Sequence, residues 1–318
     1  MTILVTGGAG FIGSRLVERL LRNGDDVRIL DNFSTGRRAN VLAFAKYVEV
    51  VEGDIRCYEH VCEAMRGCDA VLHQAALPSV PRSIADPLTS HATNATGTLN
   101  VLVAARDEGV RRLVFASSSS VYGAGDGLPK HEAMQTLPIS PYGTAKLAAE
   151  SYCRSFHEVY GLETVALRYF NVFGPYQDPA SEYAAVIPRF IAAYAEGRRP
   201  VIFGDGEQSR DFTFVDNVVD ANLSALAAPG VSGRVYNVAC GDRITLNELA
   251  GELRIQMGLV VEPEHGPARA GEIRHSLADI DRARRELNYE PRVGFSAGLR
   301  RTIAHVVGEP VALALAAA

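Results

Sequence analysis

The sequence predicts an α/β fold, in which a doubly wound parallel sheet is followed by a smaller, interleaved C-terminal region. Short apolar runs recur over residues 1–174, and segments with helical periodicity separate several of them. A glycine-rich turn follows the first run, and after Pro175 loops with Pro, Gly and Arg become frequent. Strands that alternate with helices favour a parallel sheet covered on both faces.

Seven apolar runs are short enough to form buried strands. They occupy residues 2–7, 26–31, 48–54, 70–76, 112–118, 163–174 and 234–240. Helices are expected over residues 13–24, 93–109 and 144–160. Because the run at 234–240 is expected to rejoin the first sheet, we assign 1–174, with about 212–240, to the first domain. The smaller region then comprises 175–211 and 241–318.

The composition is that of an ordinary globular protein, with 47% hydrophobic and 22% charged residues among 318. A net charge of −5 gives nucleic-acid binding no global electrostatic support. The five cysteines are odd in number and form no CxxC pair, which favours a reduced, cytoplasmic protein without a metal site. No signal peptide is expected, and the apolar tract at 310–318 is too short to span a bilayer.

The turn "TGGAGFIG" at residues 6–13 holds Gly7, Gly10 and Gly13 between a strand and a helix. Glycines let the backbone approach a pyrophosphate closely, and the helix N-terminus offers it N–H groups and a positive dipole. Asp31 ends the second strand, 18 positions after Gly13, where an acid can bind a ribose diol. Together they predict a Rossmann-type dinucleotide site, with a purely structural glycine turn as the alternative.

The same carboxylate bears on the choice of dinucleotide. Asp31 would repel the extra phosphate of NADP, so the sequence favours NAD as the cofactor. Arg37 and Arg38 lie nearby in the sequence and could soften that repulsion, which keeps NADP as the alternative.

Two further strand ends are candidates for cofactor contact. Asp54 follows the third strand, where it could reach an adenine or merely cap the strand. Gln74, Ala75 and Ala76 end the fourth strand, and small residues there suit the close passage of a cofactor. Ordinary strand packing is the alternative for these three.

Tyr142 and Lys146 are four residues apart, so both lie on one face if Ser140 or Pro141 starts a helix. A free tyrosine has a pKa of about 10, and a nearby ammonium and a positively charged nicotinamide would each lower it. Tyr142 could then take a proton from a sugar hydroxyl while hydride leaves the same carbon. Lys146 could also hold the nicotinamide ribose. A helix-surface pair is the alternative.

A serine run at residues 117–120 ends a strand of the same sheet, at the edge where ligands bind in doubly wound folds. A hydroxyl there can bridge a substrate oxygen and Tyr142. A strand cap is the alternative, although four serines exceed what a cap requires.

The glycine turn, the serine run before "VYG" and the YxxxK spacing together resemble the extended short-chain dehydrogenase/reductase superfamily. The segments "YFNVFGP", "SRDFTFVDN" and "RAGEIRHSLADI" are similar to those of NAD-dependent nucleotide-sugar 4-epimerases. The resemblance covers about residues 1–305. Through "HQAALPSVPRS" and "FGPYQDPASEYAAVIPRF" it is strongest to bacterial enzymes that interconvert UDP-N-acetylglucosamine and UDP-N-acetylgalactosamine.

This resemblance implies the roles of individual residues. The catalytic residues would be Ser118, Tyr142 as the base and Lys146 as its partner. The NAD-binding residues would be Gly7, Gly10, Phe11, Ile12, Gly13, Asp31, Asn32, Thr35, Gly36, Asp54, Ile55, Gln74, Ala75, Ala76, Asn94, Tyr142, Lys146 and Tyr169. The residues that bind the UDP-sugar would be Ser118, Ser119, Ser120, Asn171, Ala185, Val186, Val201, Phe203, Arg210, Arg269, Glu272 and Ser276.

Arg210 and Arg269 match the arginines that grip the diphosphate in this family, and Glu272 matches an acid on the uridine ribose. A guanidinium fork fits a diphosphate, and an acidic protein needs such local charge. Ser276 stands where a tyrosine restricts related enzymes to plain hexoses, so a serine would leave room for a 2-acetamido group. Asp178 stands where glucuronate epimerases commonly carry an arginine, which argues against a carboxylated sugar.

The resemblance implies a 4-epimerase that oxidises the sugar to a 4-ketone, lets it turn and returns the hydride to the other face. Three alternatives remain. They are a UDP-glucose/UDP-galactose 4-epimerase or one with both activities, a dehydratase, and a non-enzymatic nucleotide-sensing module. A dehydratase would need an Asp-Glu pair where this chain has Ser119 and Ser120. Relatives pair the helices expected at 93–109 and 144–160 into a four-helix interface, so a homodimer is expected.

Overall fold

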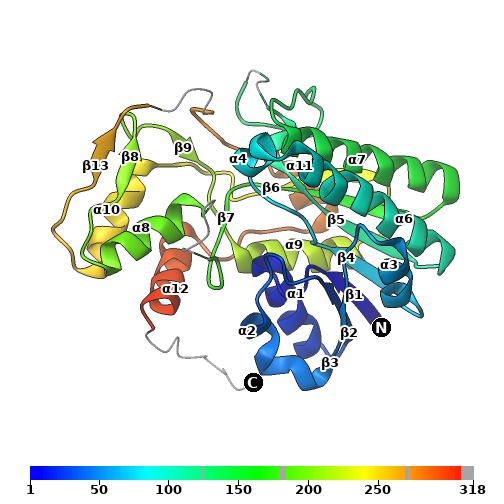
Figure 1. The fold of residues 1–318 in the computed structure, drawn as a ribbon. Helices are drawn as coiled ribbons and strands as arrows, with labels where there is room; N and C mark the ends of the chain where they lie inside the picture. Colours follow the sequence, from blue (N-terminus) through cyan, green and yellow to red (C-terminus); the bar gives the residue numbers. More distant parts are fainter. Residues whose placement is uncertain (124, 126, 179–183, 269–272, 309–318) are drawn as a thin grey trace.

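The computed structural model describes residues 1–123, 125, 127–178, 184–268 and 273–308. Its centre is a parallel sheet of seven strands in the order β11-β6-β5-β4-β1-β2-β3 (Figure 1). The strands are β1 (Thr2–Thr6), β2 (Asp26–Asp31), β3 (Val48–Glu52), β4 (Ala70–His73), β5 (Arg112–Ser118), β6 (Glu163–Tyr169) and β11 (Arg234–Val238). The predicted doubly wound fold is confirmed, including the return of the strand at 234–240 to the first sheet.

One predicted strand is broken. The run expected over 163–174 ends as β6 at Tyr169, and β7 (Val172–Phe173) pairs instead with β10 (Thr213–Phe214). Asn171 separates the two with a φ of 33°, a left-handed conformation that a continuous strand cannot contain. This turn carries the chain out of the sheet and toward the C-terminal region.

Each face of the sheet carries its own core, because successive side chains of a strand point to opposite sides. Ile3 and Val5 pack with α1 (Phe11–Arg22) and α9 (Val215–Ala227) on one face. Leu4 packs on the other face. The helices on that face are α3 (Tyr58–Met65), α6 (Gly97–Asp107) and α7 (Pro141–Tyr160).

The three predicted helices are present, with shifted ends. The helix expected at 93–109 is a π-helical turn, η2 (Ala92–Thr96), that continues into α6. In α7 the hydroxyl of Ser140 accepts a hydrogen bond from the backbone N–H of Gly143 at 3.1 Å, and Pro141 is the first helical residue. Gly161, with a φ of 72°, ends α7. Tyr142 and Lys146 therefore lie in the first turns of α7.

A third core lies at one end of the sheet, at the left of Figure 1. Its helices are α8 (Val186–Ala195), α10 (Leu246–Met257) and α12 (Phe295–Val307). Its short strands are β8 (Val201–Phe203), β13 (Glu264–Gly266), β9 (Ser209–Arg210) and β12 (Ile244–Thr245). Within the expected smaller region, α11 (Asp281–Leu287) packs on the core of the first sheet instead.

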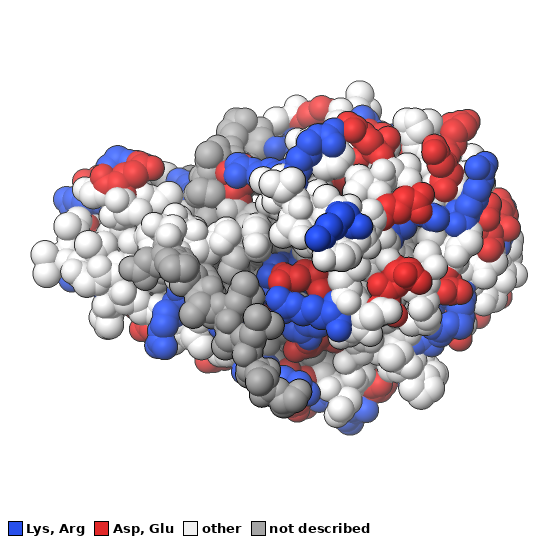
Figure 2. Space-filling model, turned by 90° about the horizontal axis from the view of Figure 1, so that it is seen from below, with Lys and Arg blue, Asp and Glu red and all other residues white. Residues whose placement is uncertain are grey.

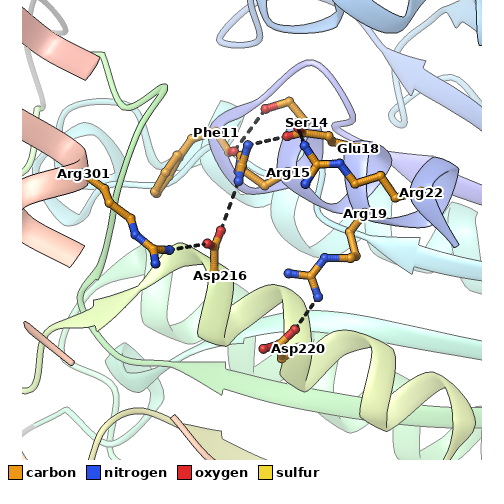
Figure 3. Close-up of polar contacts among 9 residues, drawn as sticks. All are labelled: Phe11, Ser14, Arg15, Glu18, Arg19, Arg22, Asp216, Asp220 and Arg301. Atoms are coloured by element: carbon orange, nitrogen blue, oxygen red, sulfur yellow. Dashed lines mark hydrogen bonds and ion pairs between the residues drawn. The ribbon is translucent and has the colours of Figure 1, made fainter. Parts of the chain in front are cut away.

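Ion pairs join the helix of the glycine turn to α9, and α9 to α12 (Figure 3). A guanidinium nitrogen of Arg15 lies 3.2 Å from the carboxylate of Asp216, which also pairs with Arg301 at 3.2 Å. Arg19 pairs with Asp220 at 2.6 Å. These contacts fix α1 against the elements that lead into the third core.

In the face of the molecule that Figure 2 shows, acidic and basic side chains are interspersed over the right-hand part. Over the described residues, no helix combines the length and apolarity needed to cross a membrane. The same residues contain no group of three His, Cys, Asp or Glu side chains that could hold a metal ion.

Candidate active site

A cleft of about 980 Å³ opens at the carboxyl ends of the strands, between the sheet and the third core. It is lined by the glycine turn, the ends of several strands, the serine run and the start of α7. The residues of the predicted site that line it are Gly7, Gly10, Phe11, Ile12, Gly13, Asp31, Asn32, Thr35, Gly36, Asp54, Ile55, Gln74, Ala75, Ala76, Ser118, Ser119, Ser120, Tyr142, Lys146, Tyr169, Asn171 and Ala185. The fold thus brings most of the predicted site into one cavity.

The glycine turn has no room for side chains at two of its positions. Gly7 has a φ of 69°, and a Cβ there would lie 2.7 Å from the backbone nitrogen of Ala75. A Cβ on Gly13 would lie 2.0 Å from the carbonyl oxygen of Gly7. Gly10 caps α1 without a side-chain hydrogen bond, and the first turn of α1 has no acidic residue. The N-terminus of α1 is therefore suited to an anion such as a pyrophosphate.

Asp31 ties the glycine turn to the loop after β2. One carboxylate oxygen accepts a hydrogen bond from the backbone N–H of Ala9 at 2.9 Å, and the other accepts one from Phe33 at 2.8 Å. Burial raises the pKa of Asp31, and the two N–H donors lower it. Since an ionised carboxylate has about four acceptor positions, Asp31 can still bind the hydroxyls of a ribose.

Both arginines near Asp31 have acidic partners. Arg37 forms an ion pair with Asp178, and Arg38 forms one with Glu52 at 2.6 Å. The guanidinium of Arg38 also lies 4.0 Å from the centre of the Phe33 ring. Their charges are already engaged, so the carboxylate of Asp31 dominates this end of the cleft, as NAD rather than NADP requires.

Asp54 stays ionised at the far end of the cleft. Its carboxylate accepts hydrogen bonds from Arg56 at 2.7 Å and from the side-chain amide of Asn32 at 2.8 Å. These contacts, chiefly the hydrogen bond from Arg56, lower the pKa of Asp54 to about 2. With the glycine turn and Asp31, these residues would hold a dinucleotide along the ends of the strands.

Lys146 reaches across from α7 to β5. Its ammonium donates to the carbonyl oxygen of Ala116 at 2.8 Å and lies 5.9 Å from the centre of the Tyr142 ring. Burial lowers the pKa of Lys146 to about 7, while Cys153 and Glu150 act in the opposite direction.

The ionisation of Tyr142 differs from the expectation. Burial raises the pKa of Tyr142 to about 12, although a hydrogen bond from Ser118 lowers it. The sequence led us to expect a lowered pKa from the Lys146 ammonium. In the protein alone burial outweighs any such effect, and the Lys146 ammonium is directed to a backbone carbonyl.

Successive side chains of a strand point to opposite faces of the sheet, so the serines of the run lie in two different environments. Ser118 faces the cleft and Tyr142, and its hydroxyl oxygen also lies 3.1 Å from that of Ser120. Ser117 is 3% exposed, and its hydroxyl donates to Glu150 on α7. The serine nearest to the predicted base is therefore Ser118.

Asn94 is not brought to the cleft. It is fully buried, its side-chain oxygen accepts from the backbone N–H of Leu77 at 3.0 Å and its amide donates to the Leu77 carbonyl at 3.1 Å. The amide also donates to Ser90 at 3.3 Å. Asn94 thus fixes Leu77, which does line the cleft, and its N–H donors are used within the protein.

Several predicted substrate contacts lie outside the cleft lining. They are Val186, Val201, Phe203, Arg210 and Ser276. Arg210 donates to the backbone carbonyls of Ser209 at 2.9 Å and Arg274 at 3.2 Å. Ser276 lies behind the wall, with its hydroxyl 3.5 Å from the side-chain nitrogen of Asn171. Arg269 and Glu272 lie outside the described residues.

The cleft also contains residues that sequence reasoning missed. Leu77, Pro78, Ser79 and Arg82 line it, and all four belong to the segment "HQAALPSVPRS". That segment was part of the resemblance to nucleotide-sugar 4-epimerases, and this similarity was the signal that could have located the four residues. Asn222 on α9 lies outside the cleft lining and supports it, because its amide donates to the hydroxyl of Tyr169 at 2.8 Å.

Comparisons with known proteins agree with this geometry. The model of the NAD dependent epimerase/dehydratase family matches residues 3–239. The UDP-glucose 4-epimerase of Mycolicibacterium smegmatis is 39% identical over 312 residues, which cover 95% of this chain and 97% of the relative.

Two solved structures superpose over nearly the whole chain. The UDP-N-acetylglucosamine 4-epimerase from Methanobrevibacter ruminantium, in complex with UDP-N-acetylmuramic acid, has a TM-score of 0.92 at 39% identity and covers 97% of this chain and 98% of that chain. The UDP-glucose 4-epimerase of Thermus thermophilus in complex with NAD has a TM-score of 0.88 at 38% identity, with coverages of 97% and 99%.

Proposed function

Because the chain belongs to the NAD dependent epimerase/dehydratase family and is an NAD-dependent UDP-sugar 4-epimerase, we propose that it interconverts UDP-N-acetylglucosamine and UDP-N-acetylgalactosamine. The observation that carries the reaction is the meeting of Ser118, Tyr142 and Lys146 on one wall of the cleft, beside the glycine turn. Membership of an enzyme family sets the nucleotide-sensing alternative aside.

When bound, NAD supplies the acceptor for the hydride that leaves carbon 4 of the sugar. Tyr142 accepts the proton of the 4-hydroxyl, and Ser118 hydrogen-bonds to the same sugar oxygen. The pKa of about 12 of Tyr142 means that its ionisation needs positive charge in the cleft beyond that of Lys146. The diphosphate must stay anchored while the ketone turns, so binding and chemistry use separate parts of the site.

The choice of sugar rests on Ser276. Its hydroxyl contacts Asn171, and Asn171 forms part of the cleft wall. A bulky residue at position 276 would press on Asn171 and narrow the cleft there, whereas a serine leaves room in the cleft for a 2-acetamido group. Asp178 lies in the cleft and pairs with Arg37, so it does not offer a cation to a carboxylated sugar.

A conversion assay on four sugars tests the proposal: UDP-glucose, UDP-galactose and their two N-acetylated counterparts. We expect kcat/KM to be at least about tenfold higher for the N-acetylated pair. The Ser276→Tyr variant is expected to lose the N-acetylated activity and to keep any activity on the plain hexoses. Equal or faster conversion of UDP-glucose by the wild type would favour the alternative of a UDP-glucose 4-epimerase.

We further propose that the enzyme is a cytoplasmic homodimer that pairs α6 and α7 with the same helices of a second copy. All five cysteines are free, as a reducing compartment favours. On α7, the side chains of Tyr152 and Val159 are 40% and 69% exposed, although both are large and apolar. A second copy would cover them.

A further inference from the structure

Asp211 is a fully buried carboxylate whose hydrogen bonds join distant parts of the chain. It accepts from the backbone N–H groups of Cys240 at 2.9 Å, Gly241 at 3.1 Å and Ala278 at 3.1 Å. The first two follow β11 of the central sheet, and the third belongs to the segment that contains Ser276. One side chain thus connects the sheet to a segment that contacts Asn171 in the cleft wall.

The backbone around Asp211 makes the same connection. Ser209 donates its N–H to Arg274 at 3.0 Å, and Ser276 donates its N–H to Ser209 at 3.0 Å. The side-chain nitrogen of Asn171 lies 3.3 Å from the carbonyl oxygen of Asp211 and 3.5 Å from the hydroxyl of Ser276. Since Asn171 lines the cleft, a displacement of Asp211 would be transmitted to the cleft wall.

We infer that Asp211 is a positioning residue for the UDP-sugar: its carboxylate fixes the Ala278 backbone, and so holds the segment of Ser276 against Asn171 as substrate binding requires, without touching the substrate. The inference rests on the proposed function and deepens it. It predicts an effect on KM rather than on kcat, because Tyr142 and Lys146 are held by α7 and do not depend on this contact.

Protonation of Asp211 would weaken this arrangement. The ionised carboxylate accepts all three N–H groups, whereas a protonated oxygen becomes a donor and leaves one of them without a full acceptor. Burial raises the pKa of Asp211 to about 6, against the three N–H donors. As the pH falls through about 6, the wall should loosen and KM should rise.

Protonation of Asp211 should weaken substrate binding, but it should favour folding stability. A buried carboxyl with a raised pKa favours its protonated form in the folded state, so its contribution to stability increases as the pH falls toward 3.8. The titratable groups around Asp211 are Cys240 and Asp242 after β11, Tyr289 after α11, and His275, which bonds the hydroxyl of Ser209. The test must separate these groups from Asp211.

The experiment measures KM and kcat for UDP-N-acetylglucosamine in the NAD-loaded enzyme between about pH 5 and pH 8. The wild type should show a KM that rises as the pH falls through about 6, with a much smaller change in kcat. Asp211→Asn should raise KM about tenfold at pH 8 and remove its dependence on pH, because an amide cannot accept all three N–H groups and does not titrate. A flat wild-type KM would overturn the inference.

Two exposed or half-buried positions provide controls that leave the core intact. Asp242→Asn removes a charge that raises the pKa of Asp211, so the rise in KM should move to lower pH while KM at pH 8 stays unchanged. His275→Gln keeps a hydrogen-bonding group beside Ser209 and should leave the rise in KM in place. If the rise disappears in His275→Gln, the imidazole and not Asp211 is responsible.

Calorimetric binding of UDP-N-acetylglucosamine separates this inference from the proposed function. A wild type that binds this sugar with the expected pH dependence but does not convert it would contradict the function and support the role of Asp211. A wild type that converts it with affinity independent of pH would support the function and contradict the role of Asp211.

Discussion

Tyr142 lies in an environment that opposes the ionisation which its proposed role requires. Burial raises its pKa to about 12, and Ser118 is the neighbour that opposes this shift. The nearest ammonium, on Lys146, is directed to the carbonyl of Ala116. The phenol is therefore protonated in the protein alone, and the proposed chemistry begins only when the cleft gains positive charge.

Tyr142→Phe is expected to reduce turnover of the preferred UDP-sugar by at least about 100-fold, because the variant lacks the proposed base. The melting temperature should change little, since the ring remains and only a hydroxyl at the cleft wall is lost. Steady-state kinetics and thermal unfolding measure the two effects. Tyr47→Phe is the matched control, because Tyr47 is 63% exposed and lies outside the cleft lining. Wild-type turnover in Tyr142→Phe would remove Tyr142 as the base.

Lys146→Met is expected to abolish turnover and yet to stabilise the NAD-free protein by about 2 kcal/mol at pH 7. Burial lowers the pKa of Lys146 from its ordinary value of 10.5 to about 7. Between these two values the unfolded chain binds a proton that the folded chain does not, so stability rises with pH in this window. The free-energy cost of keeping Lys146 buried is therefore largest below about pH 7, and methionine removes this cost.

Thermal unfolding of the NAD-free proteins at about pH 7 and about pH 10 checks this prediction. The advantage of Lys146→Met should shrink at the higher pH, where the unfolded chain has also begun to lose this proton. Lys46→Met, at an exposed position, should have almost no effect at either pH. A Lys146→Met protein that unfolds below the wild type at pH 7 would contradict the prediction.

The cleft residues that the sequence located were those whose signal is local. The glycine turn, Asp31 and the Tyr142–Lys146 spacing are each read within one strand, turn or helix. Asp211 could not be located this way, because its three N–H partners are 29 to 67 residues distant in the sequence. The hydrogen bonds between the side chain of Asn94 and the backbone of Leu77 likewise depend on the tertiary fold.

The same distinction applies to helices and strands. Apolar periodicity and local caps predicted the seven strands and the three main helices, because these signals act over a few residues. The break after β6 could not be predicted, since β7 leaves the sheet to pair with β10, about 40 residues away. The π-helical turn at Ala92–Thr96 has no signal that distinguishes it from an ordinary helix.

Helix α7 is held to the sheet by a buried ion pair. Glu150 accepts two hydrogen bonds from Arg168 on β6, at 2.9 and 2.7 Å, and one from Ser117 on β5. Glu150 and Arg168 are each about 5% exposed. Since Glu150 lies one turn beyond Lys146, this contact fixes the orientation of the catalytic face of α7 against the strand that carries Ser118.

Glu150→Gln is expected to lower the free energy of unfolding by about 3 kcal/mol, because it leaves the guanidinium of Arg168 buried without a counter-charge. Urea-induced unfolding measures the loss. Glu158→Gln on the exposed side of the same helix should change the free energy by less than about 0.5 kcal/mol. An equal, small effect of both substitutions would show that the buried pair does not stabilise α7.

The cleft lies between the central sheet and the third core, and ion pairs help to hold these two parts of the molecule together. Asp216 on α9 pairs with Arg15 on α1 and with Arg301 on α12 (Figure 3). All three side chains are partly exposed, so each pair contributes little to stability by itself. Apolar packing of Phe11 and Ile12 against the third core carries the larger share of this contact.

The outer stripe of α7 lies apart from the cleft, because neither Tyr152 nor Val159 lines it. On α7, Ala148, Tyr152, Ser155 and Val159 follow helical spacing along one exposed or half-buried stripe. We expect the wild type to have the mass of a dimer by light scattering at micromolar concentration. The Tyr152→Glu/Val159→Glu double variant should have the mass of a monomer, because two carboxylates would be buried without partners in the interface.

The double variant should keep at least about half of the wild-type turnover per chain, since neither residue lines the cleft. Tyr47→Glu places the same charge at an exposed aromatic residue outside α6 and α7, and this variant should remain a dimer. A wild type of monomeric mass would contradict the proposed interface directly. A dimeric double variant would place the interface elsewhere, because two buried carboxylates at its centre would cost several kcal/mol each.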